Sequence, residues 1–551
     1  MTNKNGDNEE FVFLKHDSVG AAAAEDDTQY LEHCFLDTGD LACLMDCENP
    51  KRLIVGRTGA GKSALIDAVN RHSKNTVCLS PHSLSLNYIA NSNVISFFEE
   101  VGVNLGAFYS LLWKHILVVE LLKKKFNICN EESQKVFMRH IRNSFFKRDK
   151  NKEIAVDYLE NWGNKFWLTT EERIHEITSK IENNLSGSLG SDDSLSGVAF
   201  TASAAKALSE EQRKVVTERG RKAVSQVQIR ELENVIGMLD ADIFDDPQAK
   251  YYITIDMLDE DWTDARLRFK LIRSLIDVIR HFGKIENVKI IAALRQDLLD
   301  KVLHSQRDVG FQEEKYESLY LDIDWSNESL QQVVDLRIGN LVKRRYTKHP
   351  VTSSDIFRNK VDGLDPLEYM IKRTFKRPRD IILFVNECIA KAEGKSTITA
   401  SIIKEAEQEY SYKRLQSLAT EWQLVYPYLF QIAQIFDGMK SHFHVSEITE
   451  EILTTKYSEF AMDGLDYKSD RLMRLLDTLY TSSGNFNSVR NTLVRDLYMI
   501  GLFGIKVGPS SPVKWSYSSR LSIPPGQVKA SSQVYIHPTF YMALSIRPVK
   551  P

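Results

Sequence analysis

Short apolar runs alternate with helical patterns along much of the chain. Each run has the length of a β-strand and is bounded by polar or turn-forming residues. The clearest, residues 288–297, is nearly continuously apolar, which is typical of a parallel strand buried on both faces. The predicted strands are residues 53–55, 76–80, 251–256, 288–297 and 318–325. Because helical patterns separate them, we predict an α/β fold with a doubly wound parallel sheet.

A long helical stretch interrupts the predicted sheet. Residues 85–249 carry helical patterns, including an apolar helix at 108–122 and a polar one at 209–239. A segment rich in Ser and Gly, residues 184–203, is expected to be a flexible connection. Since the strand pattern resumes at residue 251, we interpret this stretch as an insertion into the sheet domain.

The two ends of the chain have a different pattern. The polar residues 1–20 are expected to be disordered. In the C-terminal part, helical patterns end at Gly501 and strand patterns separated by Pro, Ser and Gly follow, which predicts a winged-helix module. The predicted parts are an N-terminal extension (1–50), a sheet core in two pieces (51–84 and 250–325), a helical insertion (85–249), a helical lid (326–414) and a winged-helix-like domain (415–551).

A glycine-rich loop joins the first predicted strand to a helix. Residues 56–63, GRTGAGKS, match the pattern G-x-x-x-x-G-K-[ST]. Gly59 and Gly61 lack a Cβ, so the backbone can curl and direct N–H groups at one anion, towards which the following helix points its positive end. We predict that Lys62 contacts the β- and γ-phosphates of ATP and that the Ser63 hydroxyl binds Mg²⁺. The alternative is a glycine turn that holds no ligand.

An acidic segment follows the predicted strand at 251–256. Asp256 ends the apolar run, and Asp259 and Glu260 follow three and four residues later. A carboxylate at the end of such a strand can hold Mg²⁺ opposite the phosphate loop, and a second one can polarise the attacking water. We assign Asp256 to Mg²⁺ and Glu260 to the water, with Asp259 in reserve. The alternative is a plain acidic loop at the end of a strand.

Two arginines are candidates for phosphate contact. Arg295 lies where a neighbouring strand would direct it at the γ-phosphate, although an ion pair with Asp297 or another carboxylate is an equal alternative. Arg379 follows Pro378 in the first turn of a predicted helix and would reach the nucleotide from the lid; a solvated helix start is the alternative. The predicted catalytic residues are Lys62, Glu260, Asp259 and Arg295. The predicted nucleotide-binding residues are Gly56, Arg57, Thr58, Gly59, Ala60, Gly61, Lys62, Ser63, Ala64 and Arg379.

Composition restricts the class of protein. Hydrophobic residues make up 43% and charged residues 26% of the 551 positions, as in ordinary globular proteins. The net charge of −4 argues against a generally basic, polyanion-binding chain and leaves room for a local basic patch. The most apolar run, residues 108–122, is too short and too charged to span a bilayer. None of the six cysteines forms a C-x-x-C pair, so we expect a cytoplasmic protein with reduced thiols and no membrane association.

Taken in order, these motifs resemble those of bacterial P-loop ATPases of the additional-strand class, near the KAP and STAND NTPases. The motifs are GRTGAGKS (56–63), ITIDMLDEDW (253–262), LRQD (294–297), WSNESL (325–330), RPRD (377–380) and a tail containing IHP. The resemblance implies ATP hydrolysis coupled to a switch or to self-assembly, often beside an effector in anti-phage defence. KAP relatives often carry a second acid directly after the Walker B aspartate, where this chain has Met257. The water-activating role therefore falls to Glu260 or Asp259.

Three functions remain in competition. The first is a Mg²⁺-dependent ATPase that works as a switch, as a homo-oligomer with an effector protein as partner. The second is a nucleotide-gated module with little hydrolysis that binds DNA, RNA or a partner protein through residues 415–551. Since the last predicted helix there offers only Arg495, protein contact is preferred over nucleic acid. The third, a kinase for a small molecule, fits the acidic segment less well.

Overall fold

The computed structural model divides the chain into two compact units. Residues Asp37–Ile323 form one unit, and Met1–Leu36 together with Asp324–Pro551 form the other. We call them the sheet unit and the helical unit. The structure describes residues 11–82, 93–128, 150–162, 206, 209–211, 213–214, 217–218, 230–304, 314–343, 351–423, 425–462, 470–481, 484–508, 510–517 and 523–549.

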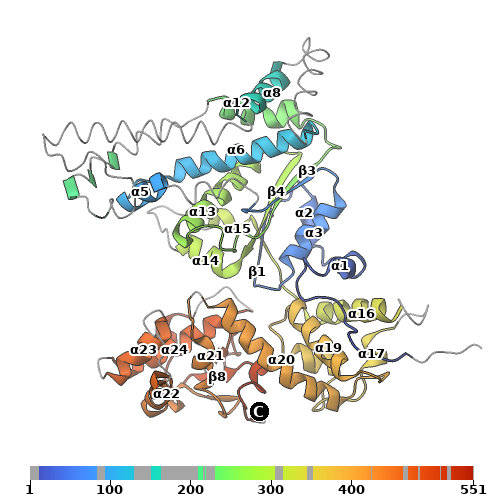
Figure 1. Cartoon of the computed structure of the whole chain (residues 1–551), viewed down its shortest axis with the longest axis vertical. Coiled ribbons are helices and arrows are strands. Elements are labelled where there is room, and N and C mark those ends of the chain that lie inside the picture. Colours follow the sequence, from blue (N-terminus) through green and yellow to red (C-terminus); the bar gives the residue numbers. More distant parts are fainter. Residues whose placement is uncertain are drawn as a thin grey trace, which may run out of the picture. The chain divides into compact units, whose positions relative to one another are not determined.

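The sheet unit is built on five parallel strands in the order β2-β3-β4-β1-β5, of which β1, β3 and β4 are labelled in Figure 1. These strands are β1 (Leu53–Gly56), β2 (Thr76–Leu79), β3 (Tyr251–Ile255), β4 (Val288–Arg295) and β5 (Tyr320–Asp322). The predicted α/β fold is therefore confirmed, and each predicted strand is present with slightly different bounds. The order places an additional strand, β4, between β1 and β3.

Helices cover both faces of this sheet. On one face, α3 packs on the strands, and the Thr254 hydroxyl on β3 donates to the Asn70 side-chain oxygen on α3 at 2.9 Å. On the other face, α13 and α14 share one hydrophobic core with Leu53 and Val55 of β1. The helices of this unit outside the insertion are α2 (Asp40–Met45), α3 (Lys62–His72), α13 (Ala265–Phe282), α14 (Gln296–His304) and α15 (Glu314–Glu317).

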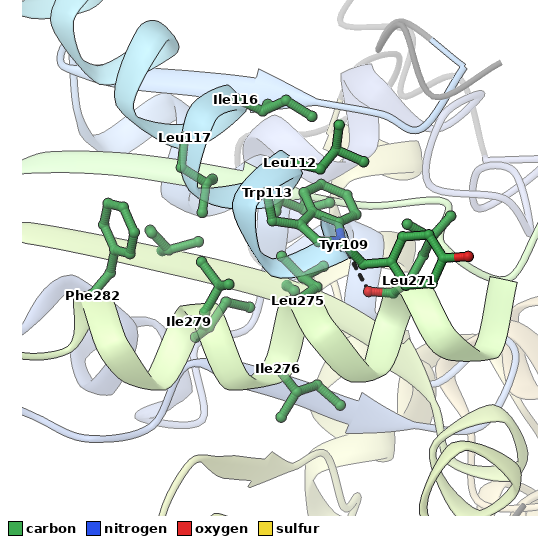
Figure 2. Packing of buried hydrophobic residues seen from close by; sticks show 14 of the residues in the cluster. Tyr109, Leu112, Trp113, Ile116, Leu117, Leu271, Leu275, Ile276, Ile279 and Phe282 are labelled. Atoms are coloured by element: carbon green, nitrogen blue, oxygen red, sulfur yellow. Dashed lines mark hydrogen bonds between the residues drawn. The ribbon is translucent and has the colours of Figure 1, made fainter. Parts of the chain in front are cut away.

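The described part of the insertion is helical and extends the same core. Figure 2 shows α6 packed along α13, with the Trp113 indole N–H donating to the Leu271 carbonyl at 2.9 Å. The insertion contains α5 (Asn93–Val101), α6 (Gly106–Lys125), α8 (Lys150–Trp162), α12 (Arg230–Met238) and a π-helical turn (Leu239–Ile243). The predicted Ser- and Gly-rich connection at 184–203 lies outside the described residues. In the part of the chain that the structure describes, no helix is long and apolar enough to cross a membrane.

In the helical unit, the N-terminal residues pack against helices from the second half of the chain. Phe13 and Val19 are buried, so the expectation of disorder for residues 1–20 is wrong for the described part, 11–20. The Arg337 guanidinium donates to the Val19 carbonyl at 2.7 Å and to the Asp27 carboxylate at 2.5 Å. The helices here are α1 (Thr28–Cys34), α16 (Asn327–Lys343), α17 (Ser353–Ile356), α18 (Pro366–Ile371), α19 (Pro378–Lys391) and α20 (Ala400–Glu421).

The C-terminal part of the helical unit combines helices with a small antiparallel sheet in the order β6-β8-β7. The strands are β6 (His442–His444), β7 (Phe503–Lys506) and β8 (Gln533–Ile536). The helices are α21 (Leu429–Gln434), α22 (Glu450–Met462), α23 (Arg471–Tyr480) and α24 (Phe486–Ile500). Sequence reasoning missed β6, because its three residues, HFH, carry no strand signal. The winged-helix interpretation stays a prediction.

Candidate functional site

The segments with predicted chemistry meet at one edge of the five-stranded sheet. Because all its strands are parallel, their carboxyl ends share an edge. The glycine loop leaves β1 there, the acidic segment leaves β3, and Arg295 ends β4 directly beside Gly56 in the register. The strand order thus brings together the loop and two motifs that follow it by some 200 residues or more, as their numbers show.

The glycine loop has the conformation that its sequence predicts. Gly59 and Gly61 have φ of +76° and +102°, in the left-handed region that residues with a Cβ rarely adopt. Gly61 is the N-cap of α3, so the helix begins at Lys62 and its unpaired N–H groups point into the loop. All of the predicted loop residues, 56–64, therefore lie on one continuous turn from strand to helix.

Lys62 folds back over the loop that precedes it. Its ammonium donates to the Gly56 carbonyl at 3.2 Å and to the Arg57 carbonyl at 3.1 Å. Burial lowers the pKa of Lys62, and the nearby carboxylates of Asp259 and Asp256 oppose that shift. A cation held in this way, beside a helix start, suits an incoming anion that can replace the two carbonyl contacts.

Asp256 and Ser63 contact each other across the edge of the sheet. The Ser63 hydroxyl donates to the Asp256 carboxylate, although Ser63 lies on α3, which follows β1, and β4 separates β1 from β3. Burial raises the pKa of Asp256 above its usual value, against the opposing effects of Ser63, the Met257 N–H and Lys62. The loss of solvent around this carboxylate therefore outweighs the stabilisation that these three groups give to its charged form.

Of the two candidate water-activating acids, Asp259 lies on the side of the loop. Its carboxylate is 3.8 Å from Arg295 Nε, and its charge acts on both Lys62 and Asp256. Arg295 itself makes a two-pronged ion pair with Asp297, at 2.9 Å for both contacts. The ion pair that sequence reasoning gave as an alternative is therefore present, and Arg295 is at the site as well.

Glu260 has a different partner. Its carboxylate lies 3.0 Å from Nε2 of His82, which follows β2, and both side chains are about half exposed. The chain turns just before the two acids, where Met257 has φ of +62°, and the buried Arg268 donates to the Glu260 carbonyl at 2.5 Å. The turn therefore directs Asp259 and Glu260 to different partners.

The arginines of the RPRD motif lie in the helical unit. Arg379 Nε donates to the Ala22 carbonyl at 3.1 Å, so it holds the N-terminal segment. Arg377 is buried and donates to Asp380 at 3.1 Å. Both side chains have structural partners within their own unit, and contact between Arg379 and a nucleotide stays a prediction.

Sequence reasoning missed two residues of the site. His82 gave no motif signal, because its role depends on a partner from another segment, Glu260. Arg268 did leave a signal: it interrupts the apolar stripe of α13 between Leu267 and Leu271, where a charged side chain needs a buried partner. A charged residue within the apolar stripe of a predicted helix therefore indicates a buried polar contact.

Comparison with known proteins shows similarity to a family model, to a curated protein and to a solved structure. Residues 328–419, which span α16 to α20, match the family model described as the FunZ-associated C-terminal helical domain. The putative transposon gamma-delta 80.3 kDa protein of Escherichia coli (strain K12) is 20% identical over 544 residues, covering 97% of this chain and 68% of that protein. The solved Walker-type ATPase paby2304 of Pyrococcus abyssi aligns with 96% of this chain and 98% of its own at 10% identity, with a TM-score of 0.34.

Proposed function

We propose that this protein is a Mg²⁺-dependent ATPase whose nucleotide site is the loop at residues 56–63. The observation that carries the proposal is the hydrogen bond between Ser63 and Asp256. It joins the start of the loop helix to the acidic end of β3, across the intervening strand β4. A glycine turn without a ligand would have no reason to place these groups together.

The residues present fit ATP and Mg²⁺. A hydroxyl and a carboxylate are the oxygen donors that Mg²⁺ prefers, so Ser63 and Asp256 would hold the metal. The N–H groups of the loop and the Lys62 ammonium would hold the β- and γ-phosphates. When bound, Mg²⁺ neutralises charge on the phosphates and thereby favours attack at the γ-phosphorus.

We assign the orientation of the attacking water to Asp259, with Glu260 in reserve. Asp259 lies beside Arg295 and close enough to Lys62 to affect its pKa, whereas Glu260 is bound to His82. An ionised carboxylate on the phosphate side can accept a proton from water. Arg295, held in place by Asp297, would stabilise the charge that develops during transfer.

Nucleotide binding and turnover in matched variants test this proposal. Lys62→Ala should abolish ATP binding. Asp259→Asn should bind Mg-ATP as the wild type does and lose turnover by about 10²- to 10⁴-fold, the usual contribution of a general base. Glu260→Gln should retain most of its turnover. If Glu260→Gln is the inactive variant and Asp259→Asn hydrolyses normally, the two roles must be exchanged.

The resemblance to additional-strand ATPases supports a wider proposal. Hydrolysis would drive a conformational switch or self-assembly, with an effector protein as partner, in anti-phage defence. Sizing the full chain with and without ATP, alone and with its genomic neighbours, tests this part. A chain that keeps one size in all four conditions would argue against assembly.

The alternative is a nucleotide-gated binding module. It is favoured if the wild type binds ATP tightly and shows no turnover, with or without its partners. Arg379 would then be the residue to examine in the helical unit, since Arg379→Ala should weaken nucleotide binding only if this side chain reaches the nucleotide.

A further inference from the structure

One face of the C-terminal sheet carries aromatic and basic side chains on neighbouring strands. Side chains alternate along a strand, so the burial of Phe443, Val534 and Ile505 identifies the face that packs on the core. His442, Tyr535 and Lys506 lie next to these residues in their strands and project from the opposite face, where each is partly exposed. We call this opposite face the outer sheet face.

Strand register aligns the aromatic rings of this face in one row. His442 pairs with Tyr535, and their rings stack with centroids 5.1 Å apart. Tyr535 pairs in turn with Gly504. The Trp515 ring covers Gly504, because a Cβ there would lie 2.9 Å from it. Three rings from three segments thus lie across one row, and glycine makes room for the third.

Basic side chains lie on both sides of the aromatic row. Lys506 is paired with Gln533 in the neighbouring row. At the opposite edge of the sheet, exposed Arg547 and Lys440 face each other across a β-bridge. Lys440 lies 4.0 Å from Glu447, a weak contact. Among the residues that the structure describes, neither Lys506 nor Arg547 forms an ion pair, so both charges are available to a ligand.

The sequence of this region has the same bias. Residues 497–551 contain six Lys and Arg and neither Asp nor Glu, in a chain whose net charge is −4. A segment with basic and no acidic side chains attracts polyanions such as nucleic acids. The net charge of the whole chain does not show this local bias, because all the acidic residues lie before residue 497.

We propose that the outer sheet face binds single-stranded nucleic acid. The rings of Trp515, Tyr535 and His442 would stack on unpaired bases, and Lys506 and Arg547 would contact phosphates. A single strand fits better than a duplex, because rings reach base faces only when the bases are unpaired. The last helix, α24, also lacks free cations for a groove: Arg490 is buried and Arg495 lies 3.5 Å from Asp496.

Binding of labelled oligothymidylate and oligouridylate of about 20 nucleotides to the full-length protein tests the proposal. Binding should weaken steeply between about 50 and 200 mM salt. The Lys506→Ala/Arg547→Ala double variant should lower the salt slope by about 1.4, because each phosphate neutralised on a single strand contributes about 0.7 to that slope. Lys360→Ala, which removes another exposed lysine of the same unit, is the matched control and should leave the slope unchanged.

Stacking is tested separately. Tyr535→Leu keeps an apolar side chain in the row and removes the ring, so affinity should fall about five- to tenfold with an unchanged salt slope. Thermal melting of each variant controls for folding. The oligomer that binds more tightly shows whether the outer sheet face prefers DNA or RNA.

Several results would overturn the proposal: no binding of either oligomer at low salt, tighter binding of duplex than of single strands, or wild-type affinity in the two face variants. Lys62→Ala should bind the oligomers as the wild type does without ATP. Failure of the ATPase proposal would therefore leave this one intact, and the converse also holds.

Discussion

Two carboxylates, the partly buried Asp256 of the sheet unit and the fully buried Asp380 of the helical unit, show opposite pKa shifts. Burial raises the pKa of Asp256, and its hydrogen bond from Ser63 and the charge of Lys62 do not compensate. Burial alone would also raise the pKa of Asp380, but Arg377 and Arg414 outweigh it and the pKa lies below the usual value. The charge of Asp380 is compensated by two arginines of its own unit, whereas the groups around Asp256 do not offset its loss of solvent. The proposed function accounts for this difference by assigning Asp256 to a bound cation.

The largest expected effect is the loss of Asp380. Arg377 and Arg414 lie 3.1 and 3.3 Å from this carboxylate, and the Phe375 N–H lies 3.0 Å from it. Asp380→Ala would remove the carboxylate that faces buried Arg414 and would leave buried Arg377 with the longer 3.7 Å contact to Glu421, so it should destabilise the helical unit by about 3–5 kcal/mol. Denaturant unfolding of the full chain measures it.

The matched control for this prediction is Asp362→Ala, which breaks an exposed pair with Lys404 and should cost under about 1 kcal/mol. A similar loss of unfolding free energy in both variants would show that the burial of Asp380 does not increase its contribution to stability.

Asp256→Asn should behave in the opposite way. The raised pKa means that the folded chain favours the uncharged form, so the neutral amide should leave the ligand-free protein as stable as before or slightly more stable. It should, however, lose the stabilisation by Mg-ATP, about 2.7 kcal/mol at a hundredfold excess over Kd. Thermal shift with and without Mg-ATP measures both effects, and the exposed Asp245→Asn is the control.

Acid should weaken the helical unit through Asp380. A carboxyl whose folded pKa lies below its unfolded value, 3.8, contributes stability above that value and loses it as the pH falls. The stability difference between the wild type and Asp380→Asn should therefore shrink from about pH 5 downward. Unfolding curves at a series of pH values test this, and a difference that stays constant down to about pH 3 would contradict it.

The smallest effect on stability is expected at Arg295. Its side chain is 18% exposed and its partner Asp297 is 29% exposed, so Arg295→Ala should change the unfolding free energy by no more than about 1 kcal/mol. Turnover should nevertheless fall by about tenfold or more, because the variant lacks the guanidinium proposed to stabilise the charge that develops during transfer. Arg377→Ala, which removes a buried arginine, should show the reverse: lower stability with nucleotide binding retained.

The sequence by itself determined the features that depend on neighbouring residues. Gly59 and Gly61 set the loop conformation, because only residues without a Cβ adopt it readily. The short apolar runs predict the five strands of the sheet, since their length and nearly continuous apolar composition are typical of buried strands. The glycine loop and the acidic segment at Asp256 could also be recognised as a matching pair of motifs, because each motif lies within a short run of consecutive residues.

Only the tertiary structure decided which side chains meet. Nothing local shows that Glu260 binds His82, 178 residues earlier, while its neighbour Asp259 lies beside Arg295. Nor does the RPRD motif show that Arg379 holds the N-terminal segment. The row of Trp515, Tyr535 and His442 likewise exists only through strand register. The partner of a charged or aromatic side chain is set by packing between distant segments, and its pKa, burial and role follow from that partner.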